Sequence, residues 1–293
     1  MRFYFVHCQK ENHSIKTLCK ALEVSRQGYY KWVKTLDRPK KPDALLDKIK
    51  AIIGDHEFNK AYGVRRIFEA LTEQGEKTSK STVQRTMKRN GLVKVKKRRP
   101  NSLTKADKQA QKSDDLLKRD FSAAKPEVKY VTDITEYPTA DGKLYVSGLF
   151  DCYDNVCAGV AMDDNMERWL PINMLRDARS KYDLTGAIVH TDRGSQYTSA
   201  DYRSELARLG IIQSMNSAAG RCYDNAKCES MWGRAKTEIL ELYDTSKMSM
   251  ADVKTLVFYY YMGYWNTKRI CSAIGGTTPY NKRAKYRESQ NAA

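Results

Sequence analysis

Apolar and polar positions divide the chain into a helical front part and a mixed back part. At the start, apolar residues recur at helical spacing over 14–22 and again over 26–33. Ser25 is a suitable N-cap for the second of these helices. A helix, a tight turn and a capped helix are typical of a helix-turn-helix, although any small helical hairpin gives a similar pattern. We therefore expect a helix-turn-helix-like segment over 1–38.

A second helical module is expected over 39–100. The pattern predicts helices over 45–53 and 62–71, and a third that begins after Ser79 or Ser81 and ends at Asn90-Gly91. Residues 101–125 are polar with scattered Lys, Asp and Ala, and we interpret them as a linker or an exposed helix.

The back part changes to β-branched, alternating segments. Three successive strands are predicted over 128–137, 143–151 and 155–162, and then helix 164–179, strand 186–190, helix 201–209, strand 211–213 and helix 223–242. This order predicts an α/β ribonuclease-H-like core over 126–245, with a mixed sheet flanked by helices, and a helical tail over 246–293.

Charge separates the same two parts. Residues 1–120 hold 30 of the 52 Lys and Arg but only 14 of the 35 Asp and Glu, and the net charge of +17 lies almost entirely there. A cationic segment attracts polyanions through counterion release, so DNA or RNA is the expected partner. The alternatives are a solvated basic surface or a ribosome-like protein.

Several basic and polar side chains are candidates for DNA contacts. Three of them lie on the exposed side of the second predicted helix, and two lie in the second module. Four more lie in a basic run that is closed by Pro100; this run would contact phosphates, but it also suits a flexible linker. These candidates are Arg26, Gln27, Lys31, Arg65, Arg66, Lys96, Lys97, Arg98 and Arg99.

Other protein classes are disfavoured. No apolar stretch approaches the roughly 20 residues of a membrane span, and the N-terminal apolar run is too short for a signal peptide. Seven cysteines without a Cys-x-x-Cys pair argue against a disulfide framework and a zinc finger. We expect a cytoplasmic protein that does not contact membranes.

Three acids in the back part suggest metal chemistry. Asp133 lies mid-strand, Asp192 follows a buried strand, and Glu229 lies inside a helix. Burial of a carboxylate is costly unless its charge is compensated, and Mg²⁺ prefers such oxygen ligands. Two ions held by converging acids can support in-line phosphoryl transfer. Each acid alone also fits a surface or capping role, and Asp192 before Arg193-Gly194 fits simple turn chemistry.

The phrases around these acids resemble bacterial insertion-sequence transposases with a retroviral-integrase-like catalytic core, and more narrowly their second-reading-frame (OrfB) component. The phrases are Val131-Thr132-Asp133-Ile134-Thr135, His190-Thr191-Asp192-Arg193-Gly194-Ser195-Gln196-Tyr197-Thr198-Ser199, and Asp224-Asn225-Ala226 followed by Glu229-Ser230. Residues 62–67 and 90–92 match the family's helical module, and residues 264–266 and 278–280 match its tail. The resemblance covers almost the whole chain.

The resemblance implies that Asp133, Asp192 and Glu229 are catalytic metal ligands for two Mg²⁺ or Mn²⁺ ions. It places Lys236 as a phosphate-contacting residue two helical turns after Glu229, on the face that also carries Gly233. It assigns Arg193 and Asn225 to DNA contacts, and Ser195, Gln196 and Tyr197 to the lining of the active site. The implied partners are double-stranded DNA at the element ends and the target, a dimer or higher homo-oligomer on DNA, and a first-frame partner protein. The expected location is the bacterial nucleoid.

Departures from the family pattern keep alternatives open. Thirty-six residues separate Asp192 from Glu229, one more than is common, and the small polar loop 216–221 can absorb the extra residue. The resemblance implies that the full enzyme also includes a first-frame segment, so a partial transposase subunit is one alternative and a DNA-binding regulator without catalysis is another. Asp151 is favoured as structural over an extra metal ligand, His190 as a core residue over a proton carrier, and Glu136 is a weak candidate for an accessory acid.

Overall fold

The computed structural model describes residues 1–36, 43–93, 113–217 and 222–291, and the chain divides into two compact units, Met1–Ala44 and Leu45–Ala293. The first unit contains α1 (Arg2–Gln9), α2 (Ile15–Ala21) and α3 (Arg26–Leu36), whose buried side chains are Val6, Leu18, Cys19 and Tyr29. The apolar spacing does not predict α1, because the run Phe3–Val6 is continuous rather than helix-spaced.

The two helices predicted in this unit are confirmed by their caps. Ser14 Oγ accepts a hydrogen bond of 3.2 Å from the Thr17 amide, and Ser25 Oγ accepts one of 2.9 Å from the Gly28 amide. Each serine satisfies an amide that has no partner within its helix. Glu23, in the turn between α2 and α3, has a φ of 52°.

The second unit opens with the helical module, which we define as residues 45–93. It contains α4 (Ala44–Gly54), the 3₁₀ turn η1 (Glu57–Ala61), α5 (Val64–Glu73) and α6 (Lys80–Arg89). Of the two serines considered for the third helix, Ser79 is the cap, because its Oγ accepts from the Thr82 amide at 3.2 Å. Gly91, with a φ of +68°, follows α6 in the left-handed conformation expected of a helix stop.

A five-stranded mixed sheet forms the centre of this unit. The strands are β1 (Lys129–Thr139), β2 (Gly142–Asp151), β3 (Cys157–Asp163), β4 (Ile188–Thr191) and β5 (Ile212–Met215), in the spatial order β3-β2-β1-β4-β5. The first three are antiparallel, and β4 and β5 run parallel to β1. The predicted meander and ribonuclease-H-like layout are confirmed.

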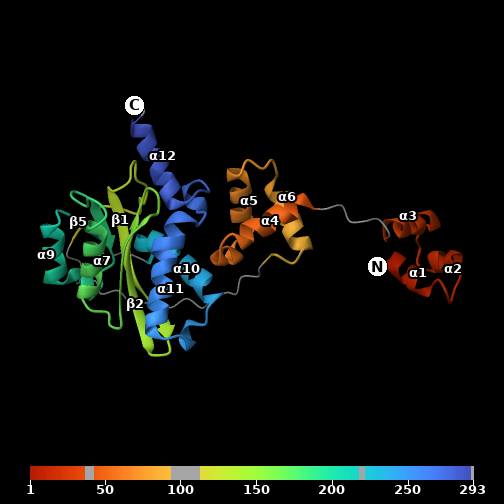
Figure 1. Ribbon diagram of the computed structural model, residues 1–293, viewed down its shortest axis with the longest axis horizontal. Coiled ribbons are helices and arrows are strands. Elements are labelled where there is room, and N and C mark those ends of the chain that lie inside the picture. The colour runs from red at the N-terminus through yellow and green to blue at the C-terminus, as the bar shows by residue number, and fades with distance from the viewer. Residues whose placement is uncertain (37–42, 94–112, 218–221, 292–293) are drawn as a thin grey trace. The chain divides into compact units, whose positions relative to one another are not determined.

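Helices cover both faces of the sheet (Figure 1). α7 (Trp169–Arg179) and α9 (Ala200–Arg208) pack on the face of Tyr130 and Val189, whereas α10 (Ala226–Leu240) and α11 (Met250–Phe258) pack on the face of Val131 and Phe150. A short helix, α8 (Ser195–Thr198), and a 3₁₀ turn, η3 (Cys222–Asn225), precede α9 and α10.

One predicted boundary is wrong by about a turn. The helix expected from residue 164 begins at Trp169. Before it, Asp163 Oδ1 accepts from the Asp164 amide at 2.8 Å and Asn165 Oδ1 accepts from the Glu167 amide at 3.3 Å. Such local side-chain bonds give the backbone an alternative to the helix.

The tail is helical, as predicted. It continues through η4 (Thr245–Lys247), a π-helical segment η5 (Tyr259–Trp265), η6 (Ser272–Ile274) and α12 (Pro279–Asn291). Aromatic residues of η5 share one hydrophobic core with the helical module and with α10. Across the described residues, no helix has the length and apolarity needed to cross a membrane.

Candidate active site

The parallel pairing of β1 and β4 brings two of the three acids together. Val131 of β1 lies opposite His190 of β4. Asp133 lies two residues after Val131 in β1, and Asp192 lies two residues after His190, just past the end of β4. The alternation of side chains places both on the same face of the sheet. Asp192 lies directly after β4, where its Oδ1 accepts a 2.9 Å hydrogen bond from the Gly194 amide. Both carboxylates therefore lie on the face that α10 covers.

The third acid, Glu229, lies in the first turn of α10, and its side chain is exposed. A close approach between α10 and β2 sets its position. Gly148 lies opposite Asp133 in the sheet, and a Cβ at this glycine would lie 2.8 Å from the ring of Trp232. The missing side chain of Gly148 lets the Trp232 ring, one turn after Glu229, rest directly on the sheet.

A polar network ties the start of α10 to the two strands. His190 Nε2 lies 2.8 Å from Asn216 Oδ1 and 3.0 Å from the Asp224 carbonyl, while its Nδ1 lies 2.8 Å from Ser214 Oγ. Two acceptors at Nε2 imply that this nitrogen carries the proton. Asn225 donates from Nδ2 to the Thr132 carbonyl, next to Asp133, at 3.0 Å. His190 is thus a fully buried, hydrogen-bonded core residue, as favoured by the sequence.

The three acids are coupled electrostatically. Burial, followed by the charge of Asp192 and more weakly that of Glu229, raises the pKa of Asp133 to about 8. The Ile134 amide and Lys236 lower it. Burial raises the pKa of Asp192, opposed by the Gly194 amide and Arg193. Burial and Asp192 raise the pKa of Glu229. The site therefore resists holding three negative charges by itself.

These residues fit a divalent cation. Burial raises the pKa of all three carboxylates, and Asp192 adds to this shift at Asp133 and Glu229. A positive ion would stabilise their charged forms, and carboxylate oxygens are the ligands that Mg²⁺ and Mn²⁺ prefer. Across the described residues, no three His, Cys, Asp or Glu side chains form a preassembled metal cluster. The acids are close enough to couple, but they are not arranged as a closed cage.

Other residues expected at the site surround these acids. Lys236 Nζ lies 5.8 Å from the centre of the Tyr137 ring, and its charge lowers the pKa of Asp133. Tyr197 is buried, and burial together with Asp133 and Asp192 keeps its pKa well above the ordinary value. Arg193 is only 9% exposed and Asn225 only 3%, so neither has the exposure of a side chain that binds DNA at the protein surface.

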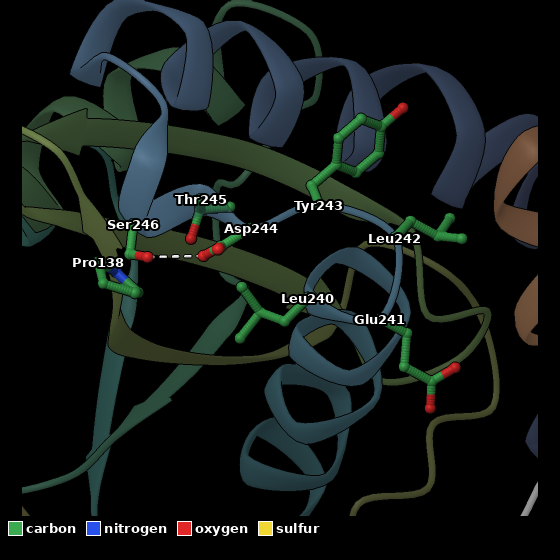
Figure 2. Close-up of a pocket in the computed structure, with 8 residues that line it drawn as sticks. All are labelled: Pro138, Leu240, Glu241, Leu242, Tyr243, Asp244, Thr245 and Ser246. Atoms are coloured by element: carbon green, nitrogen blue, oxygen red, sulfur yellow. Dashed lines mark hydrogen bonds between the residues drawn. The ribbon is translucent and has the colours of Figure 1, made fainter.

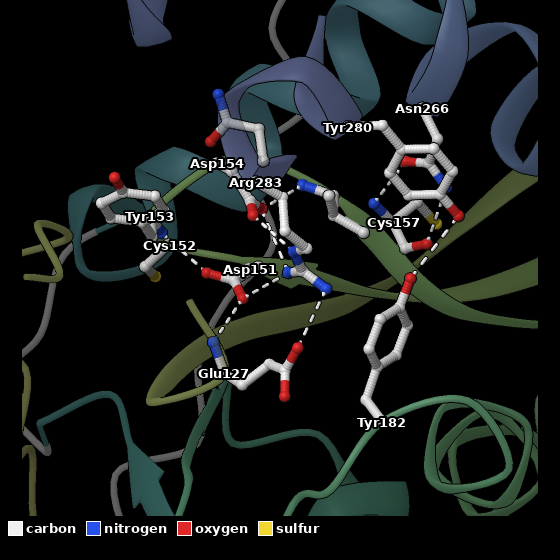
Figure 3. A network of polar contacts seen from close by, with 12 residues as sticks. Glu127, Asp151, Cys152, Tyr153, Asp154, Cys157, Tyr182, Asn266, Tyr280 and Arg283 are labelled. Atoms are coloured by element: carbon white, nitrogen blue, oxygen red, sulfur yellow. Dashed lines mark hydrogen bonds and ion pairs between the residues drawn. The ribbon is translucent and has the colours of Figure 1, made fainter. Parts of the chain in front are cut away.

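Asp151 and Asp154 belong to a separate, structural cluster (Figure 3). Arg283 of α12 reaches Asp151 Oδ2 at 2.7 Å and Asp154 Oδ2 at 2.6 Å, and Asp151 also accepts from the amides of Glu127 and Tyr153. Burial and Asp154 raise the pKa of Asp151 to about 6. The structural interpretation of Asp151 is confirmed.

Glu136 is not an accessory acid. It lies three residues from Asp133 in β1 and therefore on the opposite face of the strand. Its exposed carboxylate pairs with Lys143 at 3.1 Å.

The DNA-contact candidates differ in their surroundings. Arg26, Gln27 and Lys31 are exposed on α3. Arg65 is 65% exposed on α5 and pairs with Glu69. Arg66 is different, because its side chain is 20% exposed and its Nη1 lies 2.8 Å from buried Glu238. The basic run Lys96, Lys97, Arg98 and Arg99 and most of the loop 216–221 lie outside the described residues.

The sequence predicts α6 as a helix, but the residues of its basic side are not among the predicted DNA contacts. Val83, Thr86 and Met87 face the core, which leaves one side of this helix in solvent. We call this side the α6 basic face; its exposed residues are Lys80, Ser81, Gln84, Arg85, Lys88 and Arg89. The signal was available, since a serine-capped helix with basic residues opposite its apolar stripe is readable from the sequence.

Two hollows lie on the surface of the second unit. One, of about 410 Å³, is lined by Pro138 and residues 240–246 (Figure 2). It lies at the C-terminal end of α10, about 16 Å along the helix from Glu229 at 1.5 Å per residue. The other, of about 400 Å³, is lined by Met166, Glu167, Arg168, Ser195, Gln196 and Ser199, beside the segment that follows Asp192. Only the second adjoins the acids.

Comparisons with known proteins agree with this architecture. Two models of the integrase core domain match residues 123–222 and 211–279, and a model of an HTH-like domain matches residues 40–100. Among solved structures, the magnesium complex of the HTLV-2 integrase catalytic core domain covers 55% of this chain and 98% of its own at 16% identity, with a TM-score of 0.42, which is too distant to inform the site.

Full-length relatives are more similar. The 31 kDa protein of insertion element IS600 from Shigella sonnei is 32% identical over 272 residues, which are 92% of this chain and 99% of that protein. Transposase InsF for insertion sequence IS3A from Escherichia coli K12 is 31% identical over 283 residues, which are 95% of this chain and 97% of that protein. The chain therefore belongs to the family of insertion-sequence transposases with an integrase core.

Proposed function

We propose that this chain catalyses transposition by cutting DNA at the ends of an insertion sequence and joining those ends to target DNA, with Asp133, Asp192 and Glu229 as the catalytic acids. Family membership supports the reaction class, a polynucleotidyl transfer. The observation that carries the residue assignment is the convergence of these three acids on one face of the sheet, where each has a raised pKa.

In this proposal the three acids hold two Mg²⁺ or Mn²⁺ ions, which supply charge stabilisation for in-line displacement at phosphorus. The chain's own residues do the positioning. The parallel pairing of β1 with β4 orients Asp133 and Asp192, and the Gly194 amide fixes one oxygen of Asp192. The first turn of α10 presents Glu229, and its backbone amides favour negative charge there. Lys236 would bind a phosphate beside the acids.

DNA binding would come from the two helical segments. In the helical module, the α6 basic face is the side that can contact phosphates and base edges. In the first unit, α3 likewise presents three exposed side chains that could bind DNA: Arg26, Gln27 and Lys31. Arg66 is not part of this surface, because it is held at Glu238.

We also propose that several chains assemble on the DNA. An insertion sequence has two ends, and we infer that a dimer or a higher homo-oligomer on DNA would act on both. A first-frame partner protein would add a further DNA-binding segment. Because its substrate would be chromosomal and element DNA, the complex would act at the bacterial nucleoid.

The test is strand cleavage and strand transfer on duplex DNA that contains the element ends, with Mg²⁺. We expect Asp192→Asn to lose both reactions while its affinity for end DNA stays close to that of the wild type. Wild-type rates in this variant would refute the acid assignment. If the wild-type chain binds the ends but never cuts them, even when fused to a first-frame segment, a DNA-binding regulator would be the better description.

A further inference from the structure

Glu238 joins three parts of the second unit. It lies near the C-terminal end of α10, the helix that carries Glu229, and its side chain is 2% exposed. Arg269 of the tail donates to it from Nε at 2.9 Å and from Nη2 at 2.7 Å, and the Tyr260 hydroxyl donates at 2.6 Å. Arg66 of α5 adds a second guanidinium, with Nη1 2.8 Å from Oε1. The helical module, the catalytic helix and the tail therefore meet at one carboxylate.

Further contacts fasten the helical module to the tail. Each joins a module residue to one about 200 positions away. The Ile270 amide donates to the Tyr62 hydroxyl at 2.8 Å, the Tyr264 hydroxyl to Asn59 Oδ1 at 2.9 Å, Ser272 to Glu69 at 2.5 Å, and Thr277 to Glu73 at 3.0 Å. Between them, the Phe58 ring lies 4.9 Å from that of Tyr260 and 5.0 Å from that of Tyr264.

These contacts specify a single arrangement. A buried charge needs all its partners in place, and a shifted module would leave Glu238 with one guanidinium fewer and the Tyr62 hydroxyl unpaired. Buried polar groups of this kind can define register where apolar packing alone would tolerate sliding. The module is thus held by a directional interface and not only by the chain that connects it to the core.

We propose that the helical module acts as a fixed ruler. Docked on Glu238 and the tail, it holds the α6 basic face at one distance from Asp133 and Glu229. The phosphodiester that is cut is then chosen by its distance along the DNA from the base pairs that α6 contacts. This inference rests on the proposed function, in which α6 binds duplex DNA and the acids cut it.

The experiment maps the cut at nucleotide resolution on end-labelled element DNA with Mg²⁺. A released variant of the full chain combines Arg66→Met, Glu69→Ala and Glu73→Ala. Arg66→Met leaves Glu238 its two bonds from Arg269, and the Met side chain can pack on the Tyr62 ring that the Arg66 guanidinium covers at 5.1 Å. We expect the wild type to cut at one dominant position and the released variant to spread its cuts over neighbouring positions. Because the α6 contacts are untouched, affinity for end DNA should stay within about twofold of wild type.

Two control variants show whether a shifted cut comes from the loss of the docked interface or from a change elsewhere in the chain. Arg179→Met with Asp183→Ala removes an exposed ion pair between the last residue of α7 and the turn after it, and this variant should cut as the wild type does. Inserting about six Gly and Ser residues between Val93 and Ser113, outside the described residues, adds a flexible segment and leaves every interface residue named above unchanged. The cut should then stay at the wild-type position, and this arm decides the question even if the released variant fails to fold.

The ruler is refuted if the released variant still cuts at the single wild-type position, or if the insertion moves the cut. Failure of the proposed function looks different. In that case the wild type itself does not cut, or Arg85→Ala with Lys88→Ala on α6 leaves affinity for end DNA unchanged.

Discussion

The half-buried Asp133 and the buried Glu238 have pKa values that are shifted in opposite directions, and their neighbours explain the difference. Asp133 is surrounded by other acids, and its pKa is raised to about 8. Burial alone would also raise the pKa of Glu238, but Arg269, Arg66 and Tyr260 outweigh it and hold that pKa at about 2. The charge of Glu238 is compensated within the chain, whereas the raised pKa of Asp133 shows that its charge is not.

Removal of metal therefore has a measurable consequence at Asp133. A ligand that binds only the folded chain stabilises it by about 2.7 kcal/mol at a hundredfold excess over its Kd. We expect Mg²⁺ or Mn²⁺ to raise the Tm of the wild type and EDTA to reverse this, while Asp133→Asn responds much less. Glu136→Gln, on the other face of β1, should respond fully. An equal shift in Asp133→Asn would place the metal elsewhere.

The low pKa of Glu238 predicts a pH dependence. Its folded pKa lies below the unfolded value of 4.5, so its stabilisation is complete above pH 4.5 and is lost as the pH falls toward 2. Glu238→Gln leaves buried guanidiniums without their counter-charge and should cost about 3 kcal/mol or more at neutral pH.

Urea unfolding at pH 7 and pH 3 tests this expectation. The difference between the variant and the wild type should shrink at pH 3, because part of the wild-type advantage has by then been lost. A difference that is the same at both pH values would mean that packing, and not charge, explains the cost.

At the scale of elements, two glycines control how α10 presents Glu229. A Cβ at Gly148 would lie 2.8 Å from Trp232, whereas a Cβ at Gly233 would meet nothing within 4 Å. Gly148→Ala should therefore displace α10 and lower both stability and cleavage. Gly233→Ala should stabilise the helix by roughly 0.5–1 kcal/mol and still lower cleavage, if DNA approaches the exposed face that carries Glu229.

Thermal melts and cleavage rates of the two variants separate these effects. Full cleavage by a stabilised Gly233→Ala would show that DNA does not approach the helix there. Full stability of Gly148→Ala would show that Trp232 can move without cost.

Helix α12 depends on one buried arginine. Arg283→Met would leave Asp151 and Asp154 buried beside each other without their cation, and we expect a loss of about 3–5 kcal/mol in unfolding free energy. Arg287→Met, which changes a 63% exposed arginine on the same helix, should cost little. Equal urea midpoints for the two variants would contradict a structural role for the Arg283 cluster.

Local sequence signals explain how much of the fold and of the candidate site could be predicted. The strands around Asp133 and Asp192 and the cap at Ser79 follow from alternation and capping chemistry, so the sheet and the acids could be placed. The partners of Glu238 and Asp151 could not, because Arg66 is 172 residues from Glu238 and Arg283 is 132 from Asp151. No periodicity links such positions, and an arginine on a basic helix gives no sign that it is buried.

At the scale of the whole molecule, the sequence predicted a linker between DNA-binding and catalytic domains. The helical module lies in one compact unit with the mixed sheet and the tail, and residues 101–112 of the predicted linker 101–125 lie outside the described residues. The tail helps to join them, since it contacts α5 through η6 and α10 through Arg269, and Arg66 of the module also contacts Glu238 of α10 directly. The domain boundaries at 38, 100, 125 and 245 remain predictions, whereas the compact units divide after Ala44.

The central claim is that Asp133, Asp192 and Glu229 hold the metal ions that act on DNA. The most direct test is a change of metal preference in Asp192→Cys. Magnesium binds thiolate poorly, whereas softer metals accept it. We predict that this variant does not cut end DNA with Mg²⁺ and recovers cleavage with Mn²⁺, while Asp192→Asn recovers with neither ion. Cleavage by Asp192→Cys with Mg²⁺ at the wild-type rate would contradict the assignment.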